Sequence, residues 1–438
     1  MNSLDESCWQ FTLESEGAVD RDVKVAESQV RGTVANRAPS TMSSTTPIRL
    51  AIFSSHPIQY QAPWFRALAR APGLALRVFF SYIPDAKQQG VGFGKEFEWD
   101  IPLLDGYDWE VLPHFSVAER GPPFLRSTVR GITKSIRGFQ PDVALILGWH
   151  HVSLIQAIVT CRFMGIPIIL RGESNSLQSR PIYKRLFHRF LFAQCSSFLA
   201  IGSRNSALYE NYNVSKDNIH MARYFVDNDR FLSEFNKLYS TRTALRKAWG
   251  IRAASICFCF VGKLEPKKRP LDFVAAFRIA YKQNSNIAGL VVGSGELAKA
   301  AEADAKADNL PIVFVGFLNQ SEIPKAYISA DAIVLPSDYG ETWGLVINEA
   351  MVSGIPALVS DRVGCANDLV LDGQTGLVFP FGNIKELARC MLSLADDASF
   401  VRDLGLRARS RVLSMYSTTE AVENTMKAVR HLITGDDF

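Results

Sequence analysis

Two glutamates, Glu341 and Glu349, stand in the segment of this 438-residue chain whose residue types and spacing best suit chemistry. The segment LPSDYGETWGLVINEAMVSGIPALVSD (335–361) predicts a loop over 336–342 after a buried strand, and then a helix that begins near Trp343 or Gly344. The first N–H groups of a helix lack an intrahelical acceptor and lie at the positive end of its dipole, so they form an anion site. The groups expected at this site are those of Thr342, Trp343, Gly344 and Leu345.

The two carboxylates suit different tasks. Glu349 lies one to two turns inside the predicted helix, where its two acceptor oxygens match the two hydroxyls of a ribose diol. Gly344 would let the backbone approach a phosphate closely. The alternative is that Glu341 only complements the helix dipole and that Glu349 lies on a solvated face. The apolar run 350–352, directly after Glu349, argues against a wholly exposed acid.

The elements that must position these groups alternate between strand and helix from residue 48 onward, which predicts parallel sheets with helices on both faces. A poorly patterned stretch, 223–254, separates two series of predicted strands. The first series is 48–53, 74–80, 143–147, 167–170, 197–201 and 220–222, and the second is 256–261, 287–292, 312–315, 332–335, 357–360 and 376–378. Two doubly wound α/β units in series bind ligands at the carboxyl ends of their strands, in a cleft between the units.

The domain organisation follows from this alternation. Residues 1–46 are polar, lack the apolar region of a signal peptide, and are predicted to be a disordered extension, so Met42 is a candidate for the true start. Residues 47–224 form the first Rossmann-like unit and residues 225–417 the second. The last helix, 418–434, is predicted to pack back onto the first unit.

Composition and charge exclude several classes of protein. The 48 Lys+Arg and 44 Asp+Glu residues give a net charge of only +4, so nucleic acid is not an expected partner. The 7 cysteines include no CxxC pair, which argues against a disulfide framework or a zinc site and suits a reducing cytosol. The pair Cys257 and Cys259 lies in an apolar run and is interpreted as buried. No apolar run approaches the roughly 18–20 residues of a membrane span.

The segment 335–361 resembles the E-x7-E signature of the retaining glycosyltransferases of family 4, which adopt the GT-B fold. The matching positions are Glu341, Trp343, Gly344, Glu349, Ala350, Met351, Gly354 and Pro356. This resemblance implies a fold of two Rossmann-like domains, the first binding an acceptor and the second a nucleotide-sugar. It also implies that Glu341 lies beside the donor sugar and that Glu349 binds the ribose.

A second resemblance lies in FVGKLEPKKRP (260–270), where the family has Gly-Arg and, five residues later, Lys. Gly262, Lys263 and Lys268 occupy these positions, and the resemblance gives both cations the task of neutralising the donor diphosphate. Because Lys263 replaces an arginine, a point charge replaces a bidentate fork. The alternative is a solvated basic turn, and Lys267 is an alternative to Lys268.

Three further segments resemble the family in the same order along the chain. VVGSGE (291–296) places Gly293 and Gly295 near the nucleotide, and VGFL (315–318) places Gly316 and Phe317 against the base. DGQTGLVFP (372–380) resembles the stretch before a late helix of the family.

The mechanism implied is independent of metal and of any cofactor besides the donor. Lys263, Lys268 and the helix N-terminus would stabilise the charge that grows on the leaving diphosphate, with Glu341 beside the sugar. A possible metal motif, Asp227-Asn228-Asp229, is interpreted as structural because it lies at the entry to the second unit.

Polar residues at strand ends of the first unit are candidates for the acceptor side. Arg171 and Glu173 follow the strand after which the family commonly has a histidine; the alternative is that they form a structural ion pair. After the first strand the alternative to an acceptor role is a helix cap with a buried tyrosine. The full candidate set is His56, Gln59, Tyr60, His150, His151, Arg171 and Glu173.

Basic amphipathic stretches bear on partners and location. They are Arg126, Arg130, Lys134 and Arg137 with Leu125, Val129, Ile132 and Ile136, and Lys184, Arg185 and Arg189 with Phe187, Phe190 and Phe192. Such helices bind anionic membranes or pack their apolar faces inside the protein. If these helices bind a membrane, the sequence predicts a cytoplasmic enzyme that is peripheral to the inner face of that membrane.

The function predicted is transfer of a sugar from a nucleoside-diphosphate sugar to a glycan or lipid-linked acceptor, in cell-surface polysaccharide or glycoconjugate synthesis. A GT-B sugar-nucleotide epimerase and a non-catalytic sugar-nucleotide-binding protein are the alternatives. The base (uridine, guanosine or adenosine), the sugar and the acceptor stay open.

Overall fold

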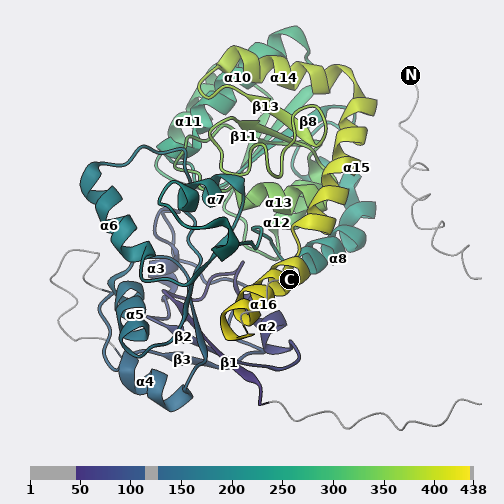
Figure 1. Cartoon of the computed structure of the whole chain (residues 1–438). Coiled ribbons are helices and arrows are strands. Elements are labelled where there is room, and N and C mark those ends of the chain that lie inside the picture. The colour runs from purple at the N-terminus through teal and green to yellow at the C-terminus, as the bar shows by residue number, and fades with distance from the viewer. Residues whose placement is uncertain (1–45, 114–126, 435–438) are drawn as a thin grey trace, which may run out of the picture. The chain divides into compact units, whose positions relative to one another are not determined.

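The computed structural model describes residues 46–113 and 127–434, and both predicted sheets are present in it (Figure 1). The described part of the first unit has a seven-stranded parallel sheet in the order β3-β2-β1-β4-β5-β6-β7. Its strands are β1 (Ile48–Ser54), β2 (Leu74–Phe80), β3 (Trp109–Val111), β4 (Val143–Ile146), β5 (Ile168–Leu170), β6 (Ser197–Ala200) and β7 (Ile219–Met221). The sequence missed β3, because three half-exposed residues give no apolar run. The predicted extension over 1–46, residue 46 apart, lies outside the described residues.

The second sheet has six parallel strands, all of them predicted, in the order β10-β9-β8-β11-β12-β13. They are β8 (Ile256–Val261), β9 (Ile287–Val292), β10 (Ile312–Gly316), β11 (Ala332–Leu335), β12 (Ala357–Ser360) and β13 (Gly376–Phe379). The strand order reverses between β8 and β11, and in the first sheet it reverses between β1 and β4.

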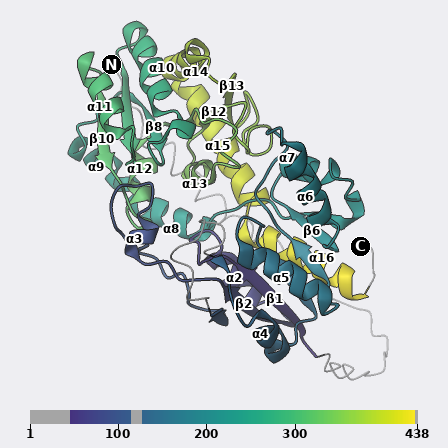
Figure 2. The same ribbon diagram turned by 90° about the vertical axis from the view of Figure 1, so that its left-hand side faces the viewer.

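Helices connect the strands as the alternation predicts (Figure 2). In the first unit they are α2 (Ala62–Ala69), α3 (Ala86–Gln89), α4 (Ile132–Phe139), α5 (Val152–Phe163), α6 (Ile182–Phe192), α7 (Ser203–Glu210) and the 3₁₀ turn η3 (Lys216–Asn218). They continue as α8 (Asn228–Leu238), η4 (Tyr239–Thr241), α9 (Arg242–Ala248), η5 (Pro266–Lys268), α10 (Pro270–Gln283), α11 (Ala298–Ala307), α12 (Ile323–Ser329), α13 (Leu345–Val352), α14 (Ile384–Asp396), α15 (Ala398–Met415) and α16 (Thr418–Thr434).

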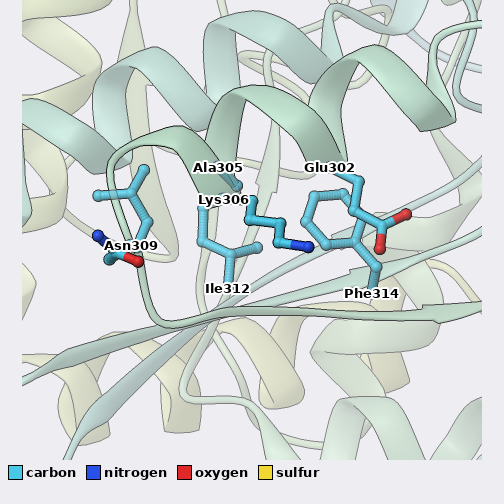
Figure 3. A pocket seen from close by; sticks show the side chains of 7 residues that line it. Glu302, Ala305, Lys306, Asn309, Ile312 and Phe314 are labelled. Carbon is cyan, nitrogen blue, oxygen red and sulfur yellow. The ribbon is translucent and has the colours of Figure 1, made fainter.

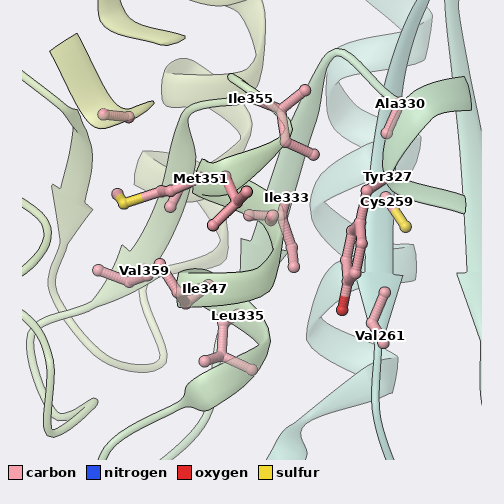
Figure 4. Close-up of a cluster of buried hydrophobic side chains, with 14 of the residues drawn as sticks. Cys259, Val261, Tyr327, Ala330, Ile333, Leu335, Ile347, Met351, Ile355 and Val359 are labelled. Carbon is pink, nitrogen blue, oxygen red and sulfur yellow. The ribbon is translucent and has the colours of Figure 1, made fainter. Parts of the chain in front are cut away.

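The second sheet has a hydrophobic core on each face, as a buried parallel sheet requires. Successive residues of β8 point to opposite faces: Cys257 and Cys259 join one core, and Phe258 and Phe260 join the other. Figure 4 shows the first of these cores, where Cys259 lies near Tyr327. The interpretation of the two cysteines as buried hydrophobic residues is therefore confirmed.

The stretch 223–254, which showed no clear pattern in the sequence, contains helix α8. Asp227 caps this helix by accepting a hydrogen bond from the N–H of Arg230 at 3.1 Å. The Asn228 amide donates to the carbonyls of Val412 and Tyr416, and so fixes α8 to the end of α15. Asp227 and Asn228 are therefore structural, and the described residues hold no group of three His, Cys, Asp or Glu arranged for a metal ion.

The last helix, α16, lies beside α2 in Figure 1, on the first unit. Its residues Ala421, Met426 and Val429 belong to the core that includes Leu50 and Trp64. An ion pair of 2.7 Å between Arg223 and Glu420 adds to this contact.

The inward face of α6 carries a buried histidine, His188. Its Nε2 accepts a hydrogen bond of 3.2 Å from the indole N–H of Trp149, and its ring stacks on Phe192. Burial, together with the charges of Arg180 and Lys184, lowers the pKa of His188 from 6.5 to about 4. The ring is therefore neutral at neutral pH.

This titration makes stability depend on pH in a defined direction. As pH falls from 6.5 to about 4, the unfolded chain takes up a proton that folded His188 does not, so stability is lost in that window. We expect His188→Gln to have a lower free energy of unfolding in urea than wild type at about pH 7.5. This difference in free energy should narrow by on the order of 2 kcal/mol at about pH 4.5. His56 and His151 are present in both proteins, so their contributions to the pH dependence cancel in the difference. A gap that stays constant with pH would contradict the assignment.

Candidate active site

The loops that leave β8 and β11 bring Lys268 and Glu341 together. The ammonium of Lys268 forms an ion pair with Oε2 of Glu341, and both side chains are only 13% exposed. The N–H of Asp338 donates to the carbonyl of Lys267 at 2.9 Å, which ties the two loops together. The side chain of Lys267 points away and pairs with Glu265, so Lys268 is the cation that faces Glu341.

Helix α13 begins at Leu345, one to two residues later than predicted, with Gly344 as its N-cap. The backbone N–H groups of Thr342, Trp343, Gly344 and Leu345 donate no hydrogen bond to the described residues. The loop before them is fixed, because the N–H of Gly364 donates to the carbonyl of Glu341 at 3.0 Å. The arrangement is a rigid helix N-terminus with open donors, which is suited to an anion.

Gly344 and Trp343 have structural tasks that the sequence did not reveal. Gly344 has a φ of +103°, and a Cβ there would lie 2.8 Å from the Leu335 side chain, so glycine is needed for the turn and for core packing. The Trp343 side chain is only 3% exposed and donates to Asn348 Oδ1 at 2.9 Å. Only the backbone of Trp343 is therefore available to a ligand.

Glu349 is buried, so the alternative that it lies on a solvated face is wrong. Its exposure is 1%, and its Oε2 accepts a hydrogen bond of 2.5 Å from the Tyr327 hydroxyl. Its Oε1 has no partner at normal hydrogen-bond geometry in the described residues, although the Tyr60 hydroxyl and the Gln320 amide interact with the carboxylate. Burial raises the pKa of Glu349, and the Tyr327 hydrogen bond only partly offsets this.

Tyr60 was predicted on the acceptor side, but the structure places it beside Glu349. It packs against the core of the second unit, and burial together with the Glu349 charge raises the pKa of its hydroxyl well above 10.0. Gln59 interacts with the same hydroxyl. Tyr60 thus interacts with Glu349, and Gln59 interacts with Tyr60.

The three predicted histidines come together where the strand order of the first sheet reverses. The rings of His150 and His151 lie 4.5 Å apart, and Tyr82 lies between His151 and His56, at 6.2 Å and 5.3 Å from their ring centres. Burial, together with a neighbouring histidine in each case, lowers the pKa of His56 and of His151 to about 4. The cluster is therefore neutral at neutral pH. Tyr82 was missed, because nothing in its sequence context distinguishes it.

Arg171 and Glu173 form no ion pair in the described residues, so the alternative of a structural pair is wrong. Arg171 is buried against the rings of Trp64 and Tyr224, at 5.0 Å and 4.8 Å from their centres. The Tyr224 hydroxyl donates to the exposed Glu173 and so stands between the two. The same loop reaches the second unit, where the Asn175 amide donates to the carbonyl of Thr342 at 3.3 Å.

Gly293 and Gly295 allow the loops after β8 and β9 to touch. A Cβ on Gly293 would lie 1.9 Å from the carbonyl oxygen of Gly262, and one on Gly295 would lie 2.6 Å from that of Leu264. Gly316 continues the contact, because its carbonyl accepts from the N–H of Gly293 at 2.8 Å. The predicted donor-binding glycines thus lie side by side.

Phe317 is covered by a segment of the first unit that the sequence did not single out. The rings of Phe93, Phe97 and Trp99 lie 5.0, 4.3 and 6.5 Å from that of Phe317. The only sequence signal was a cluster of aromatic residues in an otherwise polar loop.

A surface pocket of about 410 Å³ lies elsewhere, between α11 and the edge strand β10 (Figure 3). Its lining includes Glu302, Lys306 and Phe314, and none of the predicted site residues. It shares no residue with the site built above.

Comparisons with known proteins agree with this geometry. Residues 241–411 match the model of the family described as glycosyl transferases group 1. The D-inositol 3-phosphate glycosyltransferase of Arthrobacter sp. (strain FB24) is 30% identical over 309 residues, which cover 66% of this chain and 71% of that protein. The UDP-Gal:alpha-D-GlcNAc-diphosphoundecaprenol alpha-1,3-galactosyltransferase of Escherichia coli is 27% identical over 280 residues, covering 60% of this chain and 69% of that protein. The crystal structure of Anabaena HepE in complex with UDP and glucose superimposes with a TM-score of 0.64 at 14% identity, covering 87% of this chain and 99% of that one.

The two parallel sheets and their structural neighbours define the GT-B fold. The chain belongs to the family of glycosyl transferases group 1.

The structural task of Gly344 yields a stability prediction. We expect Gly344→Ala to destabilise the protein by about 2–5 kcal/mol, because left-handed backbone strain adds to overpacking against Leu335. Gly373 is a matched control: its φ is +68°, but a Cβ there would meet nothing within 4 Å. Gly373→Ala should lower the free energy of unfolding only through backbone strain, by about 1 kcal/mol. Urea unfolding of both variants measures the difference, and equal losses would show that Gly344 has no packing role.

Proposed function

We propose that this glycosyltransferase moves a sugar, with retention of anomeric configuration, from a nucleoside-diphosphate sugar to a glycan or lipid-linked acceptor. The observation that carries the proposal is the arrangement of Lys268, Glu341 and the open N–H groups of 342–345 at the carboxyl edge of the second sheet. The names of two similar proteins support a nucleotide-sugar donor: one names UDP-Gal, and the other a complex with UDP and glucose.

The diphosphate would bind between the two lysines and the start of α13. Lys268 ends η5 and pairs with Glu341 in the loop that leads to α13. Lys263, two residues after β8, is close enough to Lys268 for the two charges to interact. Burial and the neighbouring Lys267 and Lys268 lower the pKa of Lys263, which an incoming phosphate would reverse by supplying negative charge. Two ammonium groups and a helix N-terminus stabilise a leaving diphosphate by preorganised charge. We therefore propose that the reaction uses neither a metal ion nor a cofactor besides the donor.

The two glutamates would act on different parts of the donor. Glu341 pairs with Lys268, which we assign to the diphosphate. The sugar is the next group of the donor after the diphosphate, so we assign Glu341 to the sugar. Glu349 is buried, with Tyr327 on one oxygen and the other lacking a partner at normal geometry. A buried acceptor without a donor is costly, and a ribose hydroxyl would satisfy it. One oxygen rather than two is available, so we assign a single hydroxyl to Glu349.

The acceptor would lie against the first unit. The cluster of His56, His150 and His151 is neutral, and neutral imidazole rings both donate and accept hydrogen bonds. Glu173 is exposed and held by Tyr224, on the loop that also reaches Thr342. These groups are suited to hydroxyl-rich acceptors such as glycans.

Conservative variants of the two glutamates should separate binding from transfer. We expect Glu349→Gln to weaken binding of UDP, GDP or ADP by about tenfold, because an amide N–H₂ replaces an acceptor oxygen at the ribose. Glu341→Gln should bind the same nucleotide within about twofold of wild type but lose most sugar transfer. Calorimetry and nucleotide release from the donor measure the two properties. If Glu341→Gln lost nucleotide affinity as much as Glu349→Gln does, the division of roles would be wrong.

We also propose that α6 binds an anionic membrane surface. The helix buries His188, Leu191 and Phe192 but leaves large apolar side chains 40–66% exposed. These are Ile182, Tyr183, Leu186, Phe187 and Phe190, and they alternate with the basic residues Lys184, Arg185 and Arg189. An exposed apolar face with basic residues fits anionic lipid, and a lipid-linked acceptor would be found there.

The other basic stretch gives no such support. Residues 125 and 126 lie outside the described residues, and α4 buries Ile132, Ile136 and Phe139 in the first core. Its apolar face therefore packs inside. In the described part of the chain, no helix is both long and apolar enough to cross a membrane.

Acidic substitutions on the exposed apolar face of α6 test membrane binding. We expect Leu186→Glu combined with Phe190→Glu to reduce the fraction that floats with anionic vesicles at low salt at least about fivefold, because each change replaces apolar area with a repelled charge. Leu406→Glu is the matched control, since Leu406 is 44% exposed on α15 and lies outside α6. Wild type that fails to float at low salt, or a control that falls equally, would contradict the proposal.

A further inference from the structure

Residues 91–100, here called the strap, follow α3 and contact the loops after β8, β9 and β10, to which we assign part of the donor nucleotide. The Lys263 ammonium donates to the carbonyl of Val91 at 2.8 Å. Ser294, between Gly293 and Gly295, donates to the carbonyl of Phe93 at 2.5 Å. Beyond Phe317, the Asn319 amide donates to the Glu98 carbonyl at 2.7 Å, and the N–H of Ser321 donates to Asp100 at 3.1 Å.

The strap is itself fixed at both of its ends. Gln89, the last residue of α3, accepts from the N–H of Trp99 at 3.1 Å, and Asp85 caps α3. The rings of Phe93, Phe97 and Trp99 pack on Phe317, and the Lys95 ammonium lies 4.5 Å from the Phe317 ring centre. The first unit thus supplies an aromatic cover to the edge of the second sheet.

The strength of these contacts decides whether the strap opens. A typical hydrogen bond changes an equilibrium constant about fivefold. Four of them together would therefore favour the closed strap over an open one by several hundredfold, before any ring contact is counted. A donor that had to open the strap would bind more weakly by the same factor. A wall that stays in place is therefore favoured over a lid that opens in each cycle.

Lys263 is the residue that gains most from such a wall. A lysine ammonium is a point charge on a flexible stem and does not orient itself as a guanidinium does. Val91 takes one of its three N–H groups, and the Phe93 ring lies 4.6 Å from the ammonium. Gly92 packs against it, because a Cβ on Gly92 would lie 2.9 Å from the Lys263 ammonium. The ammonium is held in one place with donors to spare.

We propose that the strap is a fixed wall of the donor site and that residues 91–93 position the Lys263 ammonium for the donor diphosphate. The inference rests on the proposed function, since it takes the diphosphate to be the partner of Lys263. Val91, Gly92 and Phe93 are positioning residues: they act on the donor through the lysine.

Two glycines of the strap provide a matched experiment. Gly92 and Gly94 both have left-handed backbone, with φ of +84° and +70°, so alanine causes similar strain at each. Only at Gly92 does the added methyl group meet Lys263; at Gly94 it meets nothing within 4 Å. Titration calorimetry with UDP, GDP and ADP should show Gly92→Ala binding the preferred nucleotide about tenfold more weakly and Gly94→Ala within about twofold of wild type. In a Lys263→Ala background, Gly92→Ala should have no further effect.

The possible outcomes separate the two proposals. Equal affinities of Gly92→Ala and Gly94→Ala, with normal nucleotide binding by wild type, would overturn the positioning role and leave the proposed function standing. Tighter nucleotide binding by Gly92→Ala would show that the strap competes with the donor, and this result would also overturn the positioning role. If wild type bound none of the three nucleotides, the proposed function would fail and this inference with it. Urea unfolding of both variants shows whether the strain is matched.

Discussion

The strand order of the second sheet reverses between β8 and β11, so α10 and α13, which follow these strands, pack on opposite faces of the sheet. A reversal of strand order is where doubly wound sheets generally bind their ligands. Lys268 and Glu341 meet at this point, and the open N–H groups at the start of α13 lie beside them. The site therefore depends on strand order first and on its particular side chains second.

The two glutamates of one helix segment have opposite electrostatic environments. Glu341 is paired with a cation, so its charge is compensated where it stands. Glu349 is buried with hydroxyl partners, chiefly Tyr327, and burial raises its pKa. A paired charge at the edge and a hydrogen-bonded acceptor in the interior suit a phosphate-bearing and a hydroxyl-bearing part of one ligand. Tyr60 brings the first unit into the same arrangement.

The sequence predicted what depends on local patterns. Buried parallel strands are apolar runs, so every strand of the second sheet was found, and β8 even showed its two faces. The sequence placed Lys268 and Glu341 after two such strands, and the structure shows that they form an ion pair. Contacts between residues far apart in the chain were not predictable: they are Tyr60 with Glu349 and the strap on Phe317, between the units, and Tyr224 with Glu173, within the first unit. For α6 the sequence left two alternatives open, membrane binding or packing inside, because periodicity does not show which face is covered.

The central claim is that the start of α13 binds the diphosphate. Amide hydrogen exchange over residues 342–345, with and without saturating UDP, GDP or ADP, tests it most directly, because these N–H groups have no acceptor in the described chain. The account predicts that exchange of these amides slows by about tenfold or more when the nucleotide binds, together with that of the loop around Gly262. Unchanged exchange at 342–345 while calorimetry shows the nucleotide bound would place the diphosphate elsewhere and contradict the account.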